Sequence, residues 1–294
     1  MKQFSLPFTT KIQKFMKLNY ILAFSALLCS PLCSEASVAM TTENPHNSGI
    51  VIRWKDCKQR IDGFGIAQAG WAKELFAFKN REQVMDKMFG KDGLRLNILR
   101  GEIFPHYWEN EDDKDFNLND DIHIELSDSD FINKSDDLLR RGQLWLTLEA
   151  KNKYHISKLV FSTWRAPAWM KSNGEVSNGR LKAECYMDFA NYLADFYNAY
   201  KSKGIAPYAI SPSNEPGYAA PWNSSLWTAD EMGKFITSYL GPTFQKENIP
   251  AKIIFGENPL WSVCMPQLKM VSSKDFTDTI LQNYPEIKSF NLIA

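Results

Sequence analysis

The segment Ser213-Asn214-Glu215-Pro216 places an amide and a carboxyl side chain directly after a short apolar run, Tyr208-Ala209-Ile210. Prolines 212 and 216 lack the N–H that a sheet ladder needs, so strand pairing must end here. We therefore predict that Glu215 lies on a loop at the carboxyl end of a strand, where barrel enzymes keep catalytic groups. The competing interpretation is a solvated turn, because Asn and Pro are common turn residues.

Other candidate functional residues also follow predicted strands. Arg100 ends the predicted strand 94–101, Trp164 ends 158–164, and Glu257 ends 252–257. Apolar residues at helical spacing predict helices at 81–89, 144–150, 186–200, 232–240 and 276–284. Thr228 to Glu231 predict a capping box before the fourth helix, and Gly241-Pro242 predict its end.

Strands that alternate with helices predict an α/β fold with parallel strands. The clustering of candidate residues after strands favours a (β/α)8 TIM barrel, with an open parallel sheet as the alternative. About six strands follow Gly63, and the final residues resemble the middle of a strand, so we expect an incomplete barrel.

Aromatic residues in two polar loops are candidates for sugar contact, because a flat ring matches the apolar face of a pyranose. Trp108 and Tyr107 lie in the long Asp- and Asn-rich segment 102–137, and Trp222 lies in the loop that follows Glu215. Long loops in compact domains are commonly functional or disordered. The acidic run 109–115 is interpreted as a solvated face.

Residues 1–36 have the pattern of a secretory signal peptide: four Lys without an acid up to residue 17, an apolar run at 21–28, and Ser34-Glu35-Ala36. The apolar run is too short for a stable membrane span. A lipoprotein signal is disfavoured because Leu precedes both Cys29 and Cys33. We predict a secreted or periplasmic protein in which residues 37–62 form a linker and one strand, Ile50–Trp54.

Composition excludes several classes of protein. Residues 1–36 contain four Lys and one Glu, so 30 basic and 33 acidic residues remain, which argues against nucleic-acid binding. Three widely spaced cysteines, Cys57, Cys185 and Cys264, do not form a disulfide framework. The four histidines lack the spacing of metal ligands, so we expect neither a metal nor another cofactor.

The chain resembles glycoside hydrolase family 30, which includes glucosylceramidases, endo-β-1,6-galactanases, β-1,6-glucanases and xylanases. The resemblance rests on five motifs in order: Gly63-Phe64-Gly65, Asn97-Ile98-Leu99-Arg100, Trp164 with Ala166 to Gly174, Ser213-Asn214-Glu215-Pro216, and Leu240-Gly241-Pro242-Thr243. It implies a retaining (β/α)8 hydrolase domain over 63–294. It also implies a β-sandwich side domain whose first strand would be Ile50–Trp54.

The resemblance assigns Glu215 as the general acid/base and places Asn214, Arg100 and Trp164 around the substrate. The family's nucleophile follows strand seven, so we expect it beyond residue 294 and expect this chain to be inactive alone. Glu257 and Glu102 are the remaining acids at strand ends. Because the family assigns neither as nucleophile, both are interpreted as subsite or structural residues.

Glycoside cleavage by a retaining enzyme needs a protonated carboxyl and a second carboxylate about 5–5.5 Å away. Gly101 to Tyr107 lack the aspartate that contacts glucose in glucosylceramidases, which favours β-1,6-galactan, β-1,6-glucan or xylan as the substrate. Glucosylceramidase-type hydrolysis of a β-glucoside is one alternative. Others are a non-catalytic carbohydrate-binding remnant and a fragment that cannot close its barrel. The sequence does not determine the sugar, the linkage, endo or exo action, or the oligomeric state.

Overall fold

The computed structural model describes residues 53, 55–57, 60–68, 71–108, 111–112, 135–262 and 271–293. The chain divides into two units, residues 1–60 and 61–294, and the elements below belong to the second unit. The predicted signal peptide, most of the predicted strand Ile50–Trp54, and Cys264 lie outside the described residues. No helix in the described ranges has the length and apolar content needed to cross a membrane.

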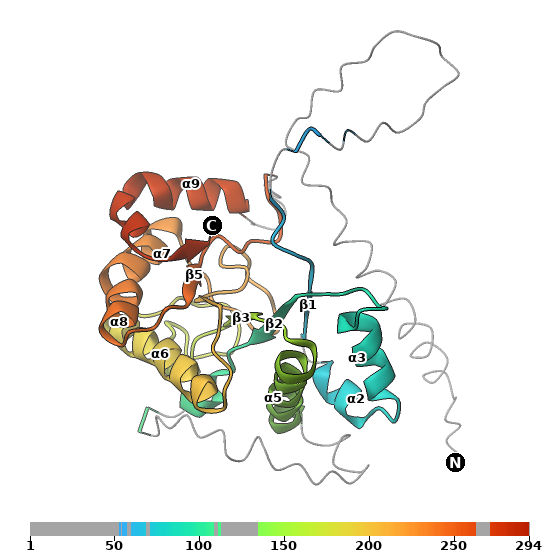
Figure 1. The fold of residues 1–294 in the computed structure, drawn as a ribbon. Helices are drawn as coiled ribbons and strands as arrows, with labels where there is room; N and C mark the ends of the chain where they lie inside the picture. Colours follow the sequence, from blue (N-terminus) through green and yellow to red (C-terminus); the bar gives the residue numbers. More distant parts are fainter. Residues whose placement is uncertain are drawn as a thin grey trace, which may run out of the picture. The chain divides into compact units, whose positions relative to one another are not determined.

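The second unit contains a sheet of six parallel strands that neighbour one another in sequence order (Figure 1). The strands are β1 (Gly65–Ala67), β2 (Ile98–Glu102), β3 (Lys158–Ser162), β4 (Ala209–Ser211), β5 (Lys252–Ile254) and β6 (Leu292–Ile293). Parallel strands in consecutive order with intervening helices are the arrangement of a TIM barrel. The predicted α/β fold is confirmed, as the part of a (β/α)8 barrel that these six strands form.

The strand register aligns the ends from which the candidate residues emerge. Arg100 in β2 pairs with Val160 in β3, and Ser162, the last residue of β3, pairs with Ser211, the last residue of β4. Ile210 of β4 pairs with Ile253 of β5. Because the strands are parallel, the loops that follow β2, β3, β4 and β5 all leave the sheet at the carboxyl ends of the strands.

Helices connect consecutive strands and lie around the outside of the sheet (Figure 1). They are α2 (Ala72–Ala77), α3 (Arg81–Phe89), α5 (Ser135–Tyr154), α6 (Tyr186–Ser202), α7 (Ala229–Phe235), α8 (Gly241–Lys246) and α9 (Ser273–Asn283). Short 3-10 turns are η1 (Pro105–Trp108), η3 (Ala168–Met170), η4 (Ala183–Cys185) and η7 (Pro285–Ser289).

The aromatic stripe of α6 forms much of the core, as its spacing predicts. The ring centroid of Phe161 in β3 lies 5.1 Å from that of Phe196 and 5.0 Å from that of Tyr200, both with edge-to-face geometry. All three side chains are buried. Burial of each such side chain contributes roughly 1.5–3 kcal/mol. This packing fixes α6 against the strand that leads to the β3 loop.

The prediction that the fourth helix ends at Gly241-Pro242 is wrong. The π-helix η5 (Ile236–Leu240) joins α7 directly to α8, and Pro242 lies in the first turn of α8. The Gly241 N–H donates to the Ile236 carbonyl five residues earlier, which is the π-helical pattern. Pro242 lacks an N–H, and it lies where the hydrogen bonds change from the π-helical to the α-helical pattern. A Cβ at Gly241 would lie 2.4 Å from a Phe290 ring carbon, so close packing requires this glycine.

The capping box at the start of α7 fixes the end of the loop that follows Glu215. Thr228 Oγ1 accepts from the Glu231 N–H at 3.1 Å, and Glu231 Oε2 accepts from the Thr228 N–H at 2.7 Å. We expect Thr228→Ala to lower the free energy of unfolding by about 1 kcal/mol, because helix donors lose their partner. Urea denaturation of this chain measures the change.

Thr279→Ala is the matched control, because Thr279 Oγ1 donates to the Asp275 carbonyl at 2.8 Å within α9 and caps nothing. We expect this variant to change the free energy of unfolding by less than about 0.5 kcal/mol. Equal losses in the two variants would contradict the role of Thr228 as a cap.

Candidate active site

Glu215 lies on the loop after β4, as predicted, and its backbone is unusual. Its φ angle is +49°, in the left-handed region that non-glycine residues seldom adopt. Its N–H donates to the Glu257 carbonyl at 3.0 Å. A left-handed residue costs roughly 1–2 kcal/mol, and such strain is concentrated at functional sites. The surrounding loops therefore hold the Glu215 backbone in a conformation that it would not adopt in an unconstrained chain.

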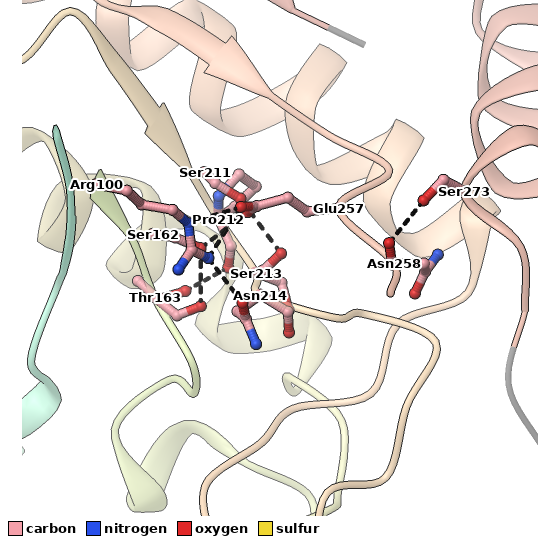
Figure 2. Close-up of polar contacts among 10 residues, drawn as sticks. All are labelled: Arg100, Ser162, Thr163, Ser211, Pro212, Ser213, Asn214, Glu257, Asn258 and Ser273. Atoms are coloured by element: carbon pink, nitrogen blue, oxygen red, sulfur yellow. Dashed lines mark hydrogen bonds and ion pairs between the residues drawn. The ribbon is translucent and has the colours of Figure 1, made fainter. Parts of the chain in front are cut away.

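Hydrogen bonds fasten the start of this loop to the end of β3. The Asn214 N–H donates to the Thr163 carbonyl at 2.6 Å, and the Thr163 N–H donates to the Ser211 carbonyl at 3.1 Å. Thr163 Oγ1 donates to the Pro212 carbonyl at 2.6 Å (Figure 2). Three consecutive contacts between neighbouring strand ends leave the Asn214 backbone little freedom.

An ion pair crosses the carboxyl ends of the strands next to this loop (Figure 2). Arg100 Nε and Nη2 each lie 2.9 Å from Glu257 Oε1, and Nη2 also donates to Asn214 Oδ1 at 2.7 Å. Ser162 Oγ donates to Glu257 Oε2 at 3.0 Å. Each side chain of the pair is 24% exposed. Arg100 thus connects the ends of β2, β4 and β5.

The structure brings together four of the residues that the sequence singles out: Arg100, Asn214, Glu215 and Glu257. The rigid donor fork of Arg100 orients a carboxylate, as its chemistry predicts. The carboxylate is that of Glu257, and both of its oxygens accept hydrogen bonds from the protein. This arrangement fits a supporting residue better than a reacting one.

The surroundings of Glu215 favour its protonated form. Burial raises the pKa of Glu215 above its ordinary value; Arg100 opposes this effect, and the Glu257 carboxylate adds to it. Desolvation disfavours the charged form of a carboxyl, and a neighbouring negative charge does the same. A carboxyl that keeps its proton to higher pH meets the requirement for a general acid.

The three predicted tryptophans differ in environment. Trp164 lies two residues after β3 and is partly buried, whereas Trp222 is 57% exposed with its ring centroid 6.3 Å from that of Tyr218. Trp108 is only 3% exposed, and its ring packs 5.7 Å from Tyr192. The prediction of Trp108 as a sugar platform is therefore corrected, because a ring buried in the core offers no face to a pyranose.

Sequence reasoning missed a buried lysine that connects the loops around the site. Lys171 is fully buried, and its Nζ donates to the carbonyls of Glu175 and Ser224, each at 2.7 Å. It therefore ties the loop after β3 to the loop after β4. Its position among polar loop residues is typical of a solvated lysine, so no local signal distinguishes it.

Asn258 is a second residue that the sequence analysis did not select. Its Oδ1 accepts a hydrogen bond from the Gly217 N–H at 2.7 Å, and Gly217 lies two residues after Glu215. Asn258 is labelled in Figure 2. The signal that could have found it is its place directly after Glu257, on a loop that follows a strand. Within the described ranges, no group of three or more His, Cys, Asp or Glu is placed to hold a metal ion.

The assembled side chains are suited to acid/base chemistry on a polar ligand. The raised pKa of Glu215 favours its protonated form, and the Asn214 amide is oriented because its Oδ1 accepts a hydrogen bond from Arg100. Because Oδ1 accepts from Arg100, the Nδ2 group of Asn214 is the part of the amide that can donate to a hydroxyl group. A proton donor beside a fixed hydrogen-bond donor can protonate a leaving oxygen while orienting its neighbour.

Comparisons with known proteins identify relatives of this chain. Residues 61–256 match the family model described as "Glycosyl hydrolase family 30 TIM-barrel domain". Putative glucosylceramidase 3 of Caenorhabditis elegans is 31% identical over 216 residues, which are 69% of this chain and 40% of that protein. Glucuronoxylanase XynC of Bacillus subtilis strain 168 is 28% identical over 79% of this chain and 46% of its own length.

Solved structures share the fold. An endo-β1,6-glucanase superposes with a TM-score of 0.59 at 21% identity and covers 79% of this chain and 51% of its own. SrfJ of Salmonella typhimurium superposes with a TM-score of 0.53 at 26% identity, over 68% of this chain and 44% of its own. The chain spans under half the length of the two curated relatives described above. The strand order, the matched residues 61–256 and these similarities together place the chain in glycosyl hydrolase family 30.

Proposed function

We propose that this chain carries the acid/base half of the active site of a retaining β-glycosidase that acts on a β-linked glycan. The main supporting observation is Glu215, a carboxyl with a raised pKa on the loop after β4, next to the hydrogen-bonded Arg100 and Asn214. Because the chain belongs to glycosyl hydrolase family 30, the reaction proposed for this carboxyl is hydrolysis of a glycosidic bond. The whole enzyme's activity, substrate and partners are part of the proposal.

The proposed reaction has two steps. Glu215 first donates its proton to the glycosidic oxygen while a second carboxylate attacks the anomeric carbon, so the leaving sugar departs as an alcohol. The Glu215 carboxylate then takes a proton from a water molecule, whose oxygen attacks the anomeric carbon. This attack breaks the bond between the sugar and the nucleophile, so the sugar is released and the nucleophile is free again. Asn214 Nδ2 would hold a substrate hydroxyl in both steps.

The nucleophile must lie about 5–5.5 Å from the acid in a retaining enzyme. Glu257 is a poor candidate, because Arg100 and Ser162 occupy its oxygens. We place the nucleophile on a later strand of the barrel, after β6, so that turnover requires the protein that continues this chain. The relatives, which are more than twice as long as the matched segment, are consistent with such a continuation.

The proposed substrate is an extended β-linked polysaccharide of the β-1,6-galactan, β-1,6-glucan or xylan type. The exposed Trp222, with Tyr218 at its edge, provides an aromatic surface on the Glu215 loop, and Trp164 lies two residues after β3. Relatives described as a glucuronoxylanase and an endo-β1,6-glucanase fit this class. The relative described as a putative glucosylceramidase makes a β-glucoside the second candidate.

We also propose that residues 1–36 direct export, which makes the enzyme secreted or periplasmic. The basic residues, the apolar run and the small residues of this segment follow the order of a signal peptide. Polysaccharide substrates of this kind occur outside the cytoplasm, so export would bring the enzyme to them.

Glu215→Gln in the complete protein tests the general acid. We expect kcat/KM on the natural glycan to fall by about 10²–10⁴-fold, because a sugar alcohol leaves poorly without a proton. Azide should partly restore turnover of an activated aryl glycoside, since that leaving group needs no acid and azide replaces the water that Glu215 would activate. Initial rates with and without azide provide the measurement.

Retention of the wild-type rate on the natural glycan by Glu215→Gln would refute the proposed mechanism. Glycan binding by the complete wild-type protein without any turnover would instead favour the carbohydrate-binding remnant. Glu286→Gln, an exposed carboxyl in η7, is the matched control and should keep the wild-type rate.

The raised pKa of Glu215 also predicts how this chain's stability depends on pH. The folded state binds the Glu215 proton more tightly than the unfolded state, so this group destabilises the fold as pH rises through its folded pKa. Glu215→Gln should therefore unfold at higher urea concentration than the wild type at pH 7. The difference should disappear below about pH 4, where the unfolded carboxyl is protonated as well. A variant less stable than the wild type at pH 7 would contradict this pKa direction.

Trp222→Ala tests the aromatic surface. Because the ring is largely exposed, we expect KM for the polysaccharide to rise severalfold, with little change in kcat or in thermal stability. Phe78→Ala is the control, since Phe78 is 49% exposed and follows the last residue of α2, away from the loops that carry the site. An unchanged KM in Trp222→Ala would show that Trp222 does not contribute to polysaccharide binding.

A further inference from the structure

We propose that Gly256, Glu257 and Asn258, the segment after β5, form a positioning clamp for the general acid/base: the clamp holds the Glu215 loop and balances the charge of Arg100. This inference rests on the proposed role of Glu215. It assigns Glu257 neither to the nucleophile nor to a sugar subsite. The segment acts on the reaction through Glu215.

The clamp holds the Glu215 loop on both sides of the turn. The Glu257 carbonyl accepts the Glu215 N–H at 3.0 Å, and Asn258 Oδ1 accepts the Gly217 N–H at 2.7 Å. Two hydrogen bonds from adjacent clamp residues thus span the residue whose φ angle is +49°. A strained backbone persists only where surrounding contacts determine it, and these are such contacts.

The clamp is itself anchored to the barrel. Gly256 has a φ angle of +77°, and a Cβ there would lie 2.2 Å from Thr277 Oγ1, so only glycine fits. The Asn258 N–H closes the turn by donating to the Gly256 carbonyl at 2.8 Å. Ser273 Oγ, in the first turn of α9, donates to the Asn258 carbonyl at 2.9 Å (Figure 2). The segment is therefore a fixed support.

The second role of the clamp is electrostatic. The charged groups that act on Glu215 are Arg100, from β2, and Glu257, from the clamp. Arg100 would stabilise the Glu215 carboxylate and so remove the proton that catalysis needs. The Glu257 carboxylate lies 2.9 Å from Arg100 and offsets its charge. The nearby guanidinium then lowers the pKa of Glu215 less than it would without Glu257.

Glu257→Gln in the complete protein tests this role. The substitution removes one negative charge and leaves the clamp backbone in place. The uncompensated guanidinium should move the basic limb of the kcat/KM profile on the natural glycan to lower pH by about one pH unit. An activated aryl glycoside, which needs no proton donor, should show little shift. Glu286→Gln should leave both profiles unchanged.

Three results would overturn the proposal. The first is a lower kcat with both limbs of the profile unmoved, which means that Glu257 only maintains the fold. The second is a higher KM with an unmoved profile, which makes Glu257 a sugar ligand. The third is loss of all turnover with azide rescue on activated substrates, which makes Glu257 the nucleophile.

A second variant tests the positioning role if Glu257→Gln folds poorly. Asn258→Ala should lower kcat more on the natural glycan than on the activated aryl glycoside, because a displaced Glu215 donates its proton less well. Asn258→Asp keeps an oxygen acceptor for the Gly217 N–H and should restore most of the loss. Equal losses in the two Asn258 variants would contradict the clamp.

A titration that does not depend on activity separates this inference from the proposed function. The carboxyl carbon of Glu215 in this chain can be followed by NMR in the wild type and in Glu257→Gln. A lower pKa in the variant supports charge balancing even if Glu215→Gln proves active and the proposed function fails. An equal or higher pKa overturns charge balancing whatever the enzyme assay shows.

Discussion

The Arg100–Glu257 ion pair is the interaction on which the rest of the site depends. It joins side chains from β2 and the loop after β5, and its further contacts reach β3 through Ser162 and the β4 loop through Asn214. Removal of one member of a partly buried pair leaves the other without compensation. The pair therefore couples four strand ends, and the position of each loop depends on its neighbours.

The same pair determines the electrostatic surroundings of Glu215. A carboxyl beside an isolated guanidinium would lose its proton readily. Here the guanidinium is ion-paired with the Glu257 carboxylate. Burial is therefore the largest effect on the Glu215 pKa, and it raises that pKa. The site thus combines a cation, which orients neighbouring groups, with a carboxyl whose pKa is raised. Neither residue alone would give both properties.

The position of Glu215 illustrates the cost of holding a reactive group. Its backbone lies in the left-handed region, and its carboxyl is partly desolvated, so both features oppose folding. Packing elsewhere offsets this cost, and the aromatic contacts between α6 and β3 are part of that packing. Natural enzymes commonly sacrifice stability in this way where function requires a strained group.

Features that depend on neighbours along the chain could be predicted from the amino-acid sequence. The spacing of apolar residues predicted α3 with its observed bounds, the Thr228 capping box is present as predicted, and the prolines around Glu215 placed it on a strand-end loop. Features that depend on residues far apart in the chain arise only when the sheet forms. Arg100 meets Glu257, 157 residues away, only because the sheet register aligns their strand ends. Trp108 is buried and packs against Tyr192 of α6, and no local pattern encodes that contact.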